Sequence, residues 1–380
     1  MKPSALVNRI LQNKERLKSQ GKVLKAGVIS LDKGDPDFPT PAHICDAAYE
    51  AMRQGYTHYV PGAGDRDLME AVCDTLKGDY GCNYEPAGII ITNGAMEGLY
   101  IACAAFLEPG DEVIVFTPGY NYASQLLMVG ALPVWVPLAP NNTLDCDALE
   151  AAVTSKTKAI LYCNPNNPTG NAFTRSEVEF LAKVALDHDL LLFADEVYKK
   201  LYYEGNSHFS AGSINEIRNR TILIDSFSKS YAMTGWRVGY VATTPQLAQP
   251  MYLVHRASVM TINTIAQKAA LAALRGPQDC LYEMVAEYDR RRRSILKKLE
   301  NLAGFDCTTP NSAFYVYGRF DARMKSAEMV EYLYEKKVAV RSGTEFGSSG
   351  EGFIRLTYAL PYTEAIEGIE RMVAAISDLD

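Results

Sequence analysis

Residues 158–198 read KAILYCNPNNPTGNAFTRSEVEFLAKVALDHDLLLFADEVY, and this stretch decides the fold. Its two apolar runs, Lys158–Tyr162 and Leu190–Ala194, are typical of strands that are covered on both faces. The segment between them, Arg175–His188, has the apolar spacing of a helix, and Thr174 suits the position before its first turn. A strand, a helix and another strand in this order predict an α/β domain with a largely parallel sheet.

The same alternation continues on both sides of this stretch. The gap between the last two apolar runs is shorter than a usual crossover, so we expect the last strand to run antiparallel to its neighbour. The fold class expected for this part is a large α/β domain whose mixed, mostly parallel sheet is flanked by helices. The further strands are predicted at Gly88–Thr92, Glu112–Phe116, Pro133–Val136, Thr221–Ile224 and Val238–Ala242, and further helices at Ala95–Phe106 and Tyr120–Val129.

Beyond about residue 250 the pattern changes, which predicts a second, smaller α+β domain. Two long helical stretches, Met251–Leu274 and Leu281–Leu302, precede a tail of short strands and helices. The change of pattern is marked by Gly276-Pro277. We therefore expect an N-terminal segment (1–40) that packs with the small domain, a large domain (41–275) and a small C-terminal domain (276–380).

The composition argues against several kinds of protein. Lys+Arg 38 and Asp+Glu 45 give a formal net charge of −7, so we expect neither nucleic acid nor a membrane as partner. For the same reason, the four arginines at 290–293 are interpreted as a solvated, ion-paired helix face. No apolar run approaches the ~20 residues that cross a bilayer, and no secretory signal is expected. The eight cysteines form no CxxC pair and the five histidines no HExxH motif, so we expect a cytoplasmic protein with reduced thiols and no metal site.

Polar clusters follow four of the predicted strands, at the point where each strand ends. They are Asn93–Met96, Asn164–Gly170, Asp195–Tyr198 and Ser226–Lys229. Ligands of open α/β sheets bind beyond the carboxyl ends of the strands, so we expect these clusters to meet at one site. The glycine turn that opens the first helix exposes backbone N–H groups, which suits a phosphate group.

Three of these segments together resemble a known family. NPNNPTG (164–170), DEVY (195–198) and SFSKSYAMTGWRVG (226–239) are similar, in order and spacing, to the fold type I pyridoxal-phosphate enzymes of the class I/II aminotransferase family. The resemblance runs from about residue 30 to the C-terminus, and its pattern resembles the branch of prokaryotic aspartate and broad-specificity aminotransferases. Shorter stretches that also fit are GDPDF (34–38), YVPGAG (59–64), AFY (313–315) and FIRL (353–356).

The resemblance implies pyridoxal 5'-phosphate as cofactor and assigns residues to it. It implies that Lys229 forms the Schiff base with the cofactor and then acts as the base at the substrate Cα. Asp195 is implied to pair with the pyridinium nitrogen, while Asn167 and Tyr198 hydrogen-bond the phenolic oxygen. Tyr59 is implied to reach the phosphate of the neighbouring subunit in a homodimer with shared active sites. The remaining cofactor-binding residues implied are Gly94, Ala95, Met96, Tyr120, Ser226 and Arg237.

The substrate-binding residues implied are Arg355, Gly34, Asn167 and Asp32. By resemblance, Arg355 clamps the α-carboxylate, and Gly34 lets the N-terminal segment close over the substrate. The chain departs from the family pattern at Met96, where aspartate-specific members often carry a lysine, and at Asp32-Lys33, where small or apolar residues are usual. It also departs at Arg341-Ser342-Gly343, where a Pro-Gly turn is common in the family.

These departures indicate the kind of substrate. With Met96 in place of a lysine, the pocket lacks one cation that could bind the side-chain carboxylate of an acidic substrate. Asp32, and Glu97 next to Met96, add negative charge to the pocket. Arg341 and Lys33 argue the other way, because Arg341 could bind a substrate carboxylate and Lys33 could offset the charge of Asp32. We expect an enzyme that exchanges an amino group between an L-amino acid and a 2-oxo acid, with neutral or basic donors favoured over acidic ones.

Two other functions remain open on the sequence. One is a pyridoxal-phosphate enzyme that catalyses elimination, replacement or ring closure on a functionalised side chain such as that of arginine. The motifs do not separate it from an aminotransferase, because they bind the cofactor and do not choose the bond that breaks. The other is a non-catalytic cofactor-binding protein. Against it, Lys229, Asp195 and Arg355 are all present.

Overall fold

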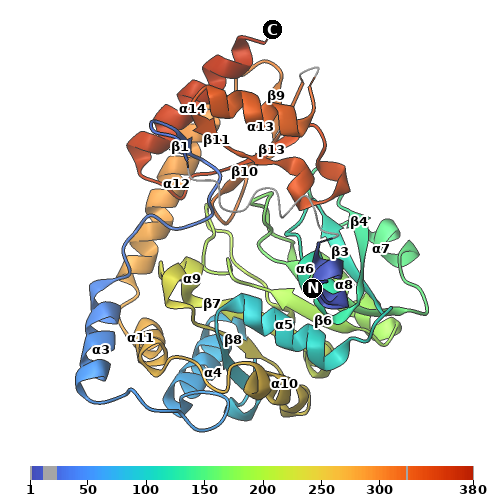
Figure 1. Ribbon diagram of the computed structural model, residues 1–380, viewed down its shortest axis with the longest axis vertical. Helices are drawn as coiled ribbons and strands as arrows, with labels where there is room; N and C mark the ends of the chain where they lie inside the picture. The colour runs from blue at the N-terminus through green and yellow to red at the C-terminus, as the bar shows by residue number, and fades with distance from the viewer. Residues whose placement is uncertain (1, 12–23, 322–323, 380) are drawn as a thin grey trace.

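The computed structural model describes residues 2–11, 24–321 and 324–379 (Figure 1). Its largest sheet has seven strands. Five of them, β3 to β7, lie parallel to one another, and β8 runs antiparallel to both of its neighbours, which confirms the prediction made from the short gap before it. In order across the sheet the strands are β2 (Ile89–Thr92), β8 (Gly239–Ala242), β7 (Thr221–Ser226), β6 (Leu191–Asp195), β5 (Thr157–Cys163), β3 (Glu112–Thr117) and β4 (Leu132–Pro137).

Side chains alternate between two cores on the two faces of this sheet. On β5, Ala159 and Leu161 join one core, whereas Ile160 and Tyr162 join the other. Strands that are buried on both faces read as continuous apolar runs, which is why the sequence revealed them. The first core is completed by α5 (Ala95–Phe106), α6 (Ala123–Val129) and α10 (Pro245–Ser258), and the second by α3 (Ala42–Arg53), α4 (Arg66–Tyr80), α7 (Cys146–Ala151), α8 (Arg175–Asp187) and α11 (Thr264–Arg275).

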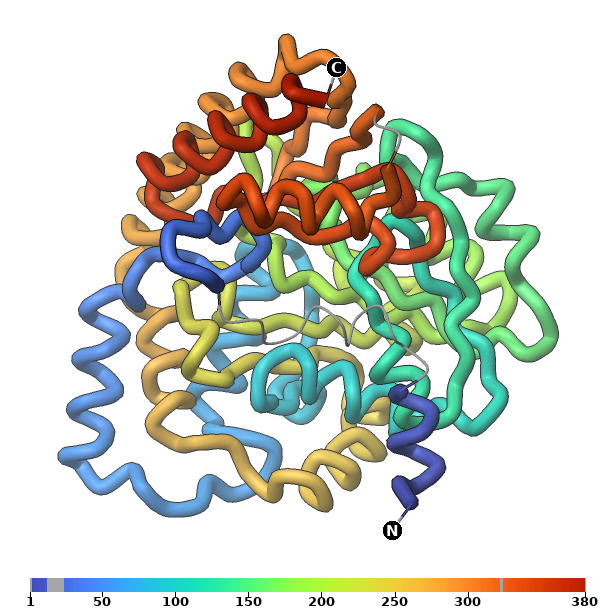
Figure 2. The backbone as a smooth tube through the Cα atoms, turned by 45° about the horizontal axis from the view of Figure 1, so that its top comes forward, coloured from blue at the N-terminus to red at the C-terminus, as the bar shows by residue number. Residues whose placement is uncertain are grey.

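A smaller unit lies above the large sheet in Figure 1 and is built on α12 (Asp279–Leu299). Its antiparallel sheet has the order β12 (Arg341–Ser342), β13 (Phe353–Thr357), β10 (Tyr315–Phe320) and β9 (Phe305–Cys307). α13 (Ser326–Glu335) packs against this sheet, and α14 (Tyr362–Ser377) packs against α12. Figure 2 shows the N-terminal segment running alongside these helices, where β1 (Ile29–Ser30) pairs in parallel with β11 (Val338–Ala339). The first helix, α1 (Ala5–Ile10), contacts α6 instead.

Two predicted helices differ from the structure. The stretch Met251–Leu274 is two helices, α10 and α11, rather than one. The chain breaks between them because Met260 adopts a left-handed conformation (φ 65°) and Asn263 caps the second helix through its side chain. The helix predicted from Tyr120 begins at Ala123, since the side chain of Asn121 accepts a hydrogen bond from the Ala123 N–H.

The four arginines of α12 do not form one solvated face. The side chains of Arg291 and Arg292 are only 4% and 1% exposed, while those of Arg290 and Arg293 are more than half exposed. Successive residues of a helix point about 100° apart, so a run of four must place some of them inward. The prediction of ion pairs is confirmed, and the prediction that all four are solvated is wrong.

Among the described residues, no helix is long and apolar enough to cross a membrane. In the same part of the chain, no group of three or more histidine, cysteine, aspartate or glutamate residues could hold a metal ion.

Candidate active site

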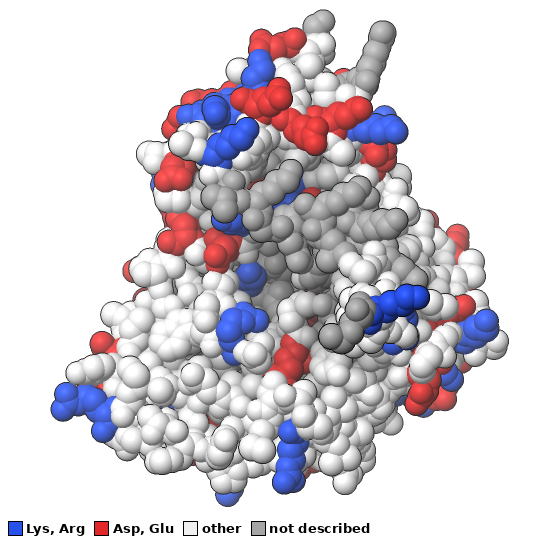
Figure 3. All heavy atoms as spheres, viewed as in Figure 1, with Lys and Arg blue, Asp and Glu red and all other residues white. Residues whose placement is uncertain are grey.

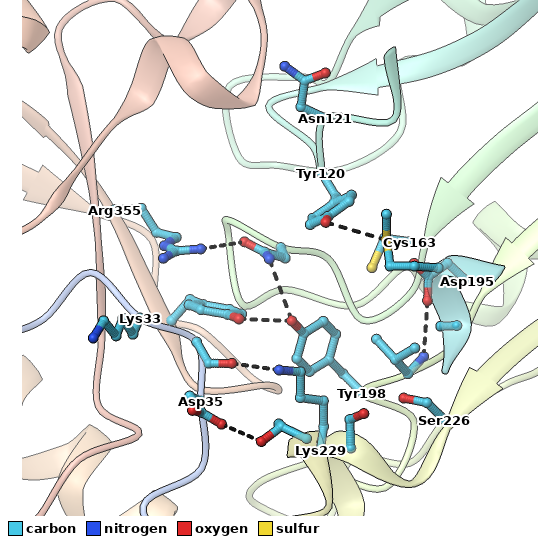
Figure 4. A pocket seen from close by; sticks show the side chains of 18 of the residues that line it. Lys33, Asp35, Tyr120, Asn121, Cys163, Asp195, Tyr198, Ser226, Lys229 and Arg355 are labelled. Carbon is cyan, nitrogen blue, oxygen red and sulfur yellow. Dashed lines mark hydrogen bonds between the residues drawn. The ribbon is translucent and has the colours of Figure 1, made fainter. Parts of the chain in front are cut away.

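A cavity of about 500 Å³ lies beyond the carboxyl ends of β5, β6 and β7, closed on its other side by the smaller unit and the N-terminal segment (Figure 4). Most of the residues predicted from the sequence meet here, as expected for strand ends of an open α/β sheet. Those that line the cavity are Asp32, Gly34, Ala95, Met96, Tyr120, Asn167, Asp195, Tyr198, Ser226, Lys229, Arg237 and Arg355. Gly94 lies just behind the lining, at the start of α5, and Tyr59 lies outside it with 79% of its surface exposed.

Lys229 enters the cavity from α9 (Phe227–Ser230), directly after β7. Ser226 and Gly239 pair across β7 and β8. The motif SFSKSYAMTGWRVG therefore forms one loop whose two ends meet. The Lys229 Nζ donates a hydrogen bond to the backbone carbonyl of Gly34 at 2.6 Å. Burial lowers the pKa of Lys229 to about 8, and the positive charges of Arg355 and Arg237 act in the same direction. A lysine in this state readily gives the neutral amine that Schiff-base chemistry needs.

A second buried lysine, Lys199, lies outside the cavity lining and behaves differently. Its Nζ is 2.9 Å from a carboxylate oxygen of Asp225. Burial disfavours the charge of Lys199, but Asp225, Tyr80 and Glu196 together outweigh burial and raise the pKa of this lysine above its ordinary value. The contrast singles out Lys229 as the nucleophilic amine of the two.

Asp195 ends β6 and lies on the wall of the cavity. The Tyr122 hydroxyl donates to one of its oxygens at 2.8 Å, and the Val197 N–H donates to the other at 3.3 Å. Despite these two donors, burial raises the pKa of Asp195 to about 7. None of the ion pairs formed by the described residues includes Asp195, so the carboxylate suits a cationic ligand group.

Arg355 forms the opposite wall, on β13. Its Nη1 donates to the Asn167 side-chain oxygen at 3.2 Å, and its Nη2 donates to the backbone carbonyl of Asp32. The Arg355 Nε is buried and lacks a hydrogen-bond partner among the described residues, and burial lowers the pKa of this guanidinium. Asn167 also donates to the Tyr198 hydroxyl at 3.5 Å, which connects the two walls. A buried guanidinium with a spare donor suits a carboxylate ligand.

The third corner of the cavity has the features of an anion site. α5 begins at Ala95, after Gly94 with φ 74°, so the N-terminus of this helix lies at the cavity, which Ser226 also lines. A Cβ on Gly94 would lie 2.5 Å from a guanidinium nitrogen of Arg237, which explains the glycine. Arg237 is held by the carbonyls of Thr234 and Asn93 at 2.8 and 3.3 Å. A helix N-terminus beside an arginine and a hydroxyl suits a phosphate group.

Glu97 does not belong to the cavity, so its predicted contribution to the substrate pocket is wrong. One carboxylate oxygen accepts from the Asn93 N–H at 2.5 Å, and the other lies 2.8 Å from His255 Nδ1. Helical geometry explains the difference, because Met96 and Glu97 point about 100° apart around α5. Met96 itself lines the cavity, where its sulfur accepts a hydrogen bond from the Tyr120 hydroxyl at 3.7 Å.

Several lining residues were missed from the sequence. Glu345 lies 3.2 Å from Arg341, which also lies 3.8 Å from Asp32, so two carboxylates flank this guanidinium. Glu345 follows no motif, and no sequence signal would have singled it out. Tyr315 stands in the AFY stretch, which supported the resemblance without a role of its own. Others that the sequence did not assign are Asn121, Thr234 and Phe346.

Comparisons with known proteins agree with this arrangement. The family model for aminotransferase class I and II matches residues 26–372. The aspartate aminotransferase of Pyrococcus abyssi is 38% identical over 353 residues, covering 91% of this chain and 90% of that protein. The aromatic-amino-acid aminotransferase 2 of Thermococcus litoralis is 37% identical over 360 residues, covering 93% of this chain and 92% of that protein. The crystal structure of the aromatic aminotransferase from Pyrococcus horikoshii OT3 matches with a TM-score of 0.92 at 36% identity, covering 98% and 99% of the two chains.

The matched region contains both walls of the cavity, from Asp32 in the N-terminal segment to Arg355 on β13. The buried lysine and the anion site also lie within the residues that the family model matches. This chain belongs to the aminotransferase class I and II family and is a pyridoxal-phosphate-dependent transferase.

Proposed function

We propose that this enzyme exchanges an amino group between an L-amino acid with a neutral or basic side chain and a 2-oxo acid, with Lys229 as the residue that carries pyridoxal phosphate. The observation that carries the proposal is the Lys229 amine, whose pKa burial lowers to about 8, in one cavity with Asp195, Arg237 and Arg355. When bound, the cofactor supplies an electron-withdrawing ring that stabilises negative charge at the substrate Cα.

The cavity fits the cofactor at each of its polar groups. Asp195, whose pKa burial raises to about 7, gains a cationic partner if it holds the proton on the ring nitrogen. Arg237, Ser226 and the first N–H groups of α5 (Ala95 and Met96, behind Gly94) hold the phosphate. Tyr120 covers a ring face. Tyr198 and Asn167 hydrogen-bond the phenolic oxygen.

The substrate α-carboxylate binds Arg355 in this proposal. The Asp32 carbonyl, which accepts from Arg355 in the present structure, is then replaced by a carboxylate oxygen, and the spare Nε donor gains a partner. Lys229 moves the proton at Cα. Gly34 supports this role, because its carbonyl accepts from Lys229 and the N-terminal segment thereby covers the amine.

The charges around Arg341 support the preference for neutral or basic donors. Asp32 and Glu345 flank this guanidinium, so its positive charge is already compensated. A second substrate carboxylate would have to enter beside these two acids, and Met96 offers it no cation. Unfavourable charge of this kind in a closed site lowers kcat/KM by roughly a hundredfold. The relatives do not decide the donor, because their names include both aspartate and aromatic amino acids.

The test is a panel of amino acids mixed with the purified holoenzyme, followed by absorbance and product mass spectrometry. The proposal expects the pyridoxamine form of the cofactor with release of the 2-oxo acid, and a larger kcat/KM for arginine or an aromatic donor than for aspartate. Ammonia release or a cyclic product would instead indicate elimination or ring closure. An aspartate preference of about tenfold or more would contradict the pocket proposal.

The acids that flank Arg341 provide a sharper test of donor choice. Glu345→Gln should raise kcat/KM for aspartate by roughly tenfold, since it frees positive charge at Arg341. The matched control is Glu179→Gln, which changes an exposed acid on α8 that pairs with Arg175. An unchanged kcat/KM for aspartate in Glu345→Gln would show that Glu345 does not influence the choice of donor.

We also propose a cytoplasmic homodimer that shares its active sites. Tyr59 is 79% exposed and outside its own cavity, which supports a role in the site of a partner. Figure 3 shows mostly uncharged surface over the lower left of the molecule. Large apolar side chains are exposed on α3, on α10 and in the segments that follow these helices. They are Tyr49, Met52, Tyr56, Leu253 and Met260.

The state of the cysteines supports the proposed compartment. The eight cysteines are free, as is usual for proteins of a reducing compartment such as the cytoplasm.

We retain the division at residues 275 and 276 as a proposal. Its support is that α11 ends at Arg275 within the large core, whereas α12 contacts α14 of the smaller unit. For the predicted grouping of residues 1–40 with the smaller unit, the pairing of β1 with β11 gives support, whereas α1 contacts α6 of the large domain and residues 12–23 lie outside the described residues.

A further inference from the structure

Tyr315 contacts both walls of the active site, yet neither the motifs nor the proposed roles assign it a function. It lies on β10 of the smaller unit and is 1% exposed. Its hydroxyl oxygen lies 2.8 Å from the hydroxyl oxygen of Tyr198, which follows β6 of the large sheet. Figure 4 shows two hydrogen bonds meeting at the Tyr198 hydroxyl, and the other comes from Asn167 at 3.5 Å.

Two neighbours, Arg355 and Gly34, confine the Tyr315 side chain in this position. The guanidinium carbon of Arg355 lies 4.6 Å from the centre of the Tyr315 ring. A Cβ on Gly34 would collide with the Tyr315 hydroxyl oxygen, so the hydroxyl fills space that only a glycine leaves open. Burial raises the pKa of Tyr315 to about 12, so the hydroxyl keeps its hydrogen at neutral pH. The titratable groups that act on it are Arg355 from β13, Tyr198 from the loop after β6, Cys163 at the end of β5 and Tyr120 from the loop after β3.

We propose that Tyr315 is a positioning residue that donates its hydrogen to the Tyr198 oxygen and thereby directs the Tyr198 hydrogen to the phenolic oxygen of the bound cofactor. The inference rests on the proposed function, which gives Tyr198 that partner. A tyrosine hydroxyl has one hydrogen. If Tyr198 donates it to the cofactor, the 2.8 Å contact requires Tyr315 to be the donor.

This chain of hydrogen bonds has a measurable consequence. A hydroxyl that accepts a hydrogen bond becomes a stronger donor, because the two bonds polarise each other. A stronger bond from Tyr198 withdraws charge from the phenolic oxygen, which otherwise attracts the proton on the Schiff-base nitrogen at Lys229. Tyr315 therefore lowers the pKa of that nitrogen, and it does so only through Tyr198.

The experiment is a pH titration of the absorbance of the holoenzyme without substrate. Tyr315→Phe keeps the ring against Arg355 and removes only the hydroxyl. One lost hydrogen bond should raise the titration midpoint by roughly 0.3 to 1 pH unit. Tyr317→Phe is the matched control, because Tyr317 lies on the same strand with a buried hydroxyl that has no hydrogen-bond partner among the described residues. Its midpoint should stay at the wild-type value.

A second background separates a direct effect from one through Tyr198. In Tyr198→Phe, the further change Tyr315→Phe should leave the midpoint where Tyr198→Phe alone puts it. Gly34→Ala provides an independent variant, since its methyl group displaces the Tyr315 hydroxyl and should raise the midpoint in the wild-type background.

The outcomes distinguish this inference from the proposed function. An unchanged midpoint in Tyr315→Phe, or a full additional shift in the Tyr198→Phe background, overturns the positioning role while leaving the proposed function intact. A wild-type protein that binds the cofactor without a borohydride-reducible link to Lys229 overturns the proposed function and this inference together.

Discussion

Asp195 illustrates at the scale of one residue how a site can be costly to the fold and necessary for the chemistry. Burial raises its pKa to about 7 although Tyr122 and Val197 donate hydrogen bonds to it. In the cofactor-free protein, the carboxylate is therefore charged at neutral pH only against the cost of desolvation. If Asp195 held the protonated ring nitrogen of the cofactor, the positive charge would offset the cost of burying the carboxylate.

Asp195→Asn should lower kcat by roughly 10²- to 10³-fold, because a neutral amide cannot hold the ring proton with a charge-assisted bond. Steady-state kinetics of the holoenzyme measure this. The control is Asp187→Asn, an exposed acid that pairs with Lys183 on α8. Near-wild-type turnover in Asp195→Asn would remove this residue from the mechanism.

The same substitution should affect the stability of the cofactor-free protein in the opposite sense. The folded-state pKa of this carboxyl is about 7, against an ordinary value of 3.8, so the folded chain binds more protons than the unfolded chain between these values. Its contribution to stability therefore falls as pH rises through this window. Asp195→Asn should therefore raise Tm more at pH 8 than at pH 5. Equal changes of Tm at the two pH values would show that burial does not raise this pKa.

At the scale of elements, the N-terminal segment is held against the cavity by a buried ion pair. Arg291 on α12 donates to both oxygens of Asp37, at 2.7 and 3.1 Å, and to the Tyr358 carbonyl at 3.3 Å. The residues before Asp37 supply the Gly34 and Asp32 carbonyls that accept from Lys229 and Arg355. α12 thus determines the position of residues 32–37, which cover the cavity on the side of the N-terminal segment.

Arg291→Met should raise KM for the amino acid by roughly tenfold, or about 1.4 kcal/mol, with a smaller change in kcat. The reason is that residues 32–37 lose the ion pair between Asp37 and Arg291, while the residues that contact the cofactor are unchanged. Arg290→Met is the control on the neighbouring, half-exposed arginine, which pairs with Glu287. Matching KM values for the two variants would show that the ion pair does not position the segment.

The sequence predicted the elements that have one simple pattern. The seven strands were found because both faces are apolar, and the antiparallel strand β8 because the loop before it is short. The break between α10 and α11 was missed, since both helices are amphipathic and only the five residues 259–263 separate them, among which Met260 and Asn263 make the break. In the site, strand-end polar clusters located Lys229 and Asp195. Tyr315 was missed because its contact with Tyr198 joins the two units. Glu345 was missed because it follows no motif and its pairing with Arg341 appears only in the folded smaller unit.

At the scale of the whole molecule, the exposed position of Tyr59 leads to a test of shared sites. Subunits that carry Tyr59→Phe are mixed with subunits that carry Lys229→Ala. In hybrid dimers, one site should contain both substitutions and the other neither, so activity should reappear beyond the sum of the parent proteins. The control mixes each variant with itself. A fully active monomer by light scattering would contradict the shared site.

The central claim is that Lys229 carries the cofactor, and borohydride reduction of the holoenzyme followed by peptide mapping tests it most directly. The account predicts a pyridoxyl group on the peptide that contains Lys229, whose amine has a pKa of about 8, and an unmodified Lys199, whose charge Asp225 retains. Reduced Lys229→Ala should bind the cofactor without a covalent label. A pyridoxyl group on Lys199 or any other lysine, with Lys229 unmodified, would contradict the account.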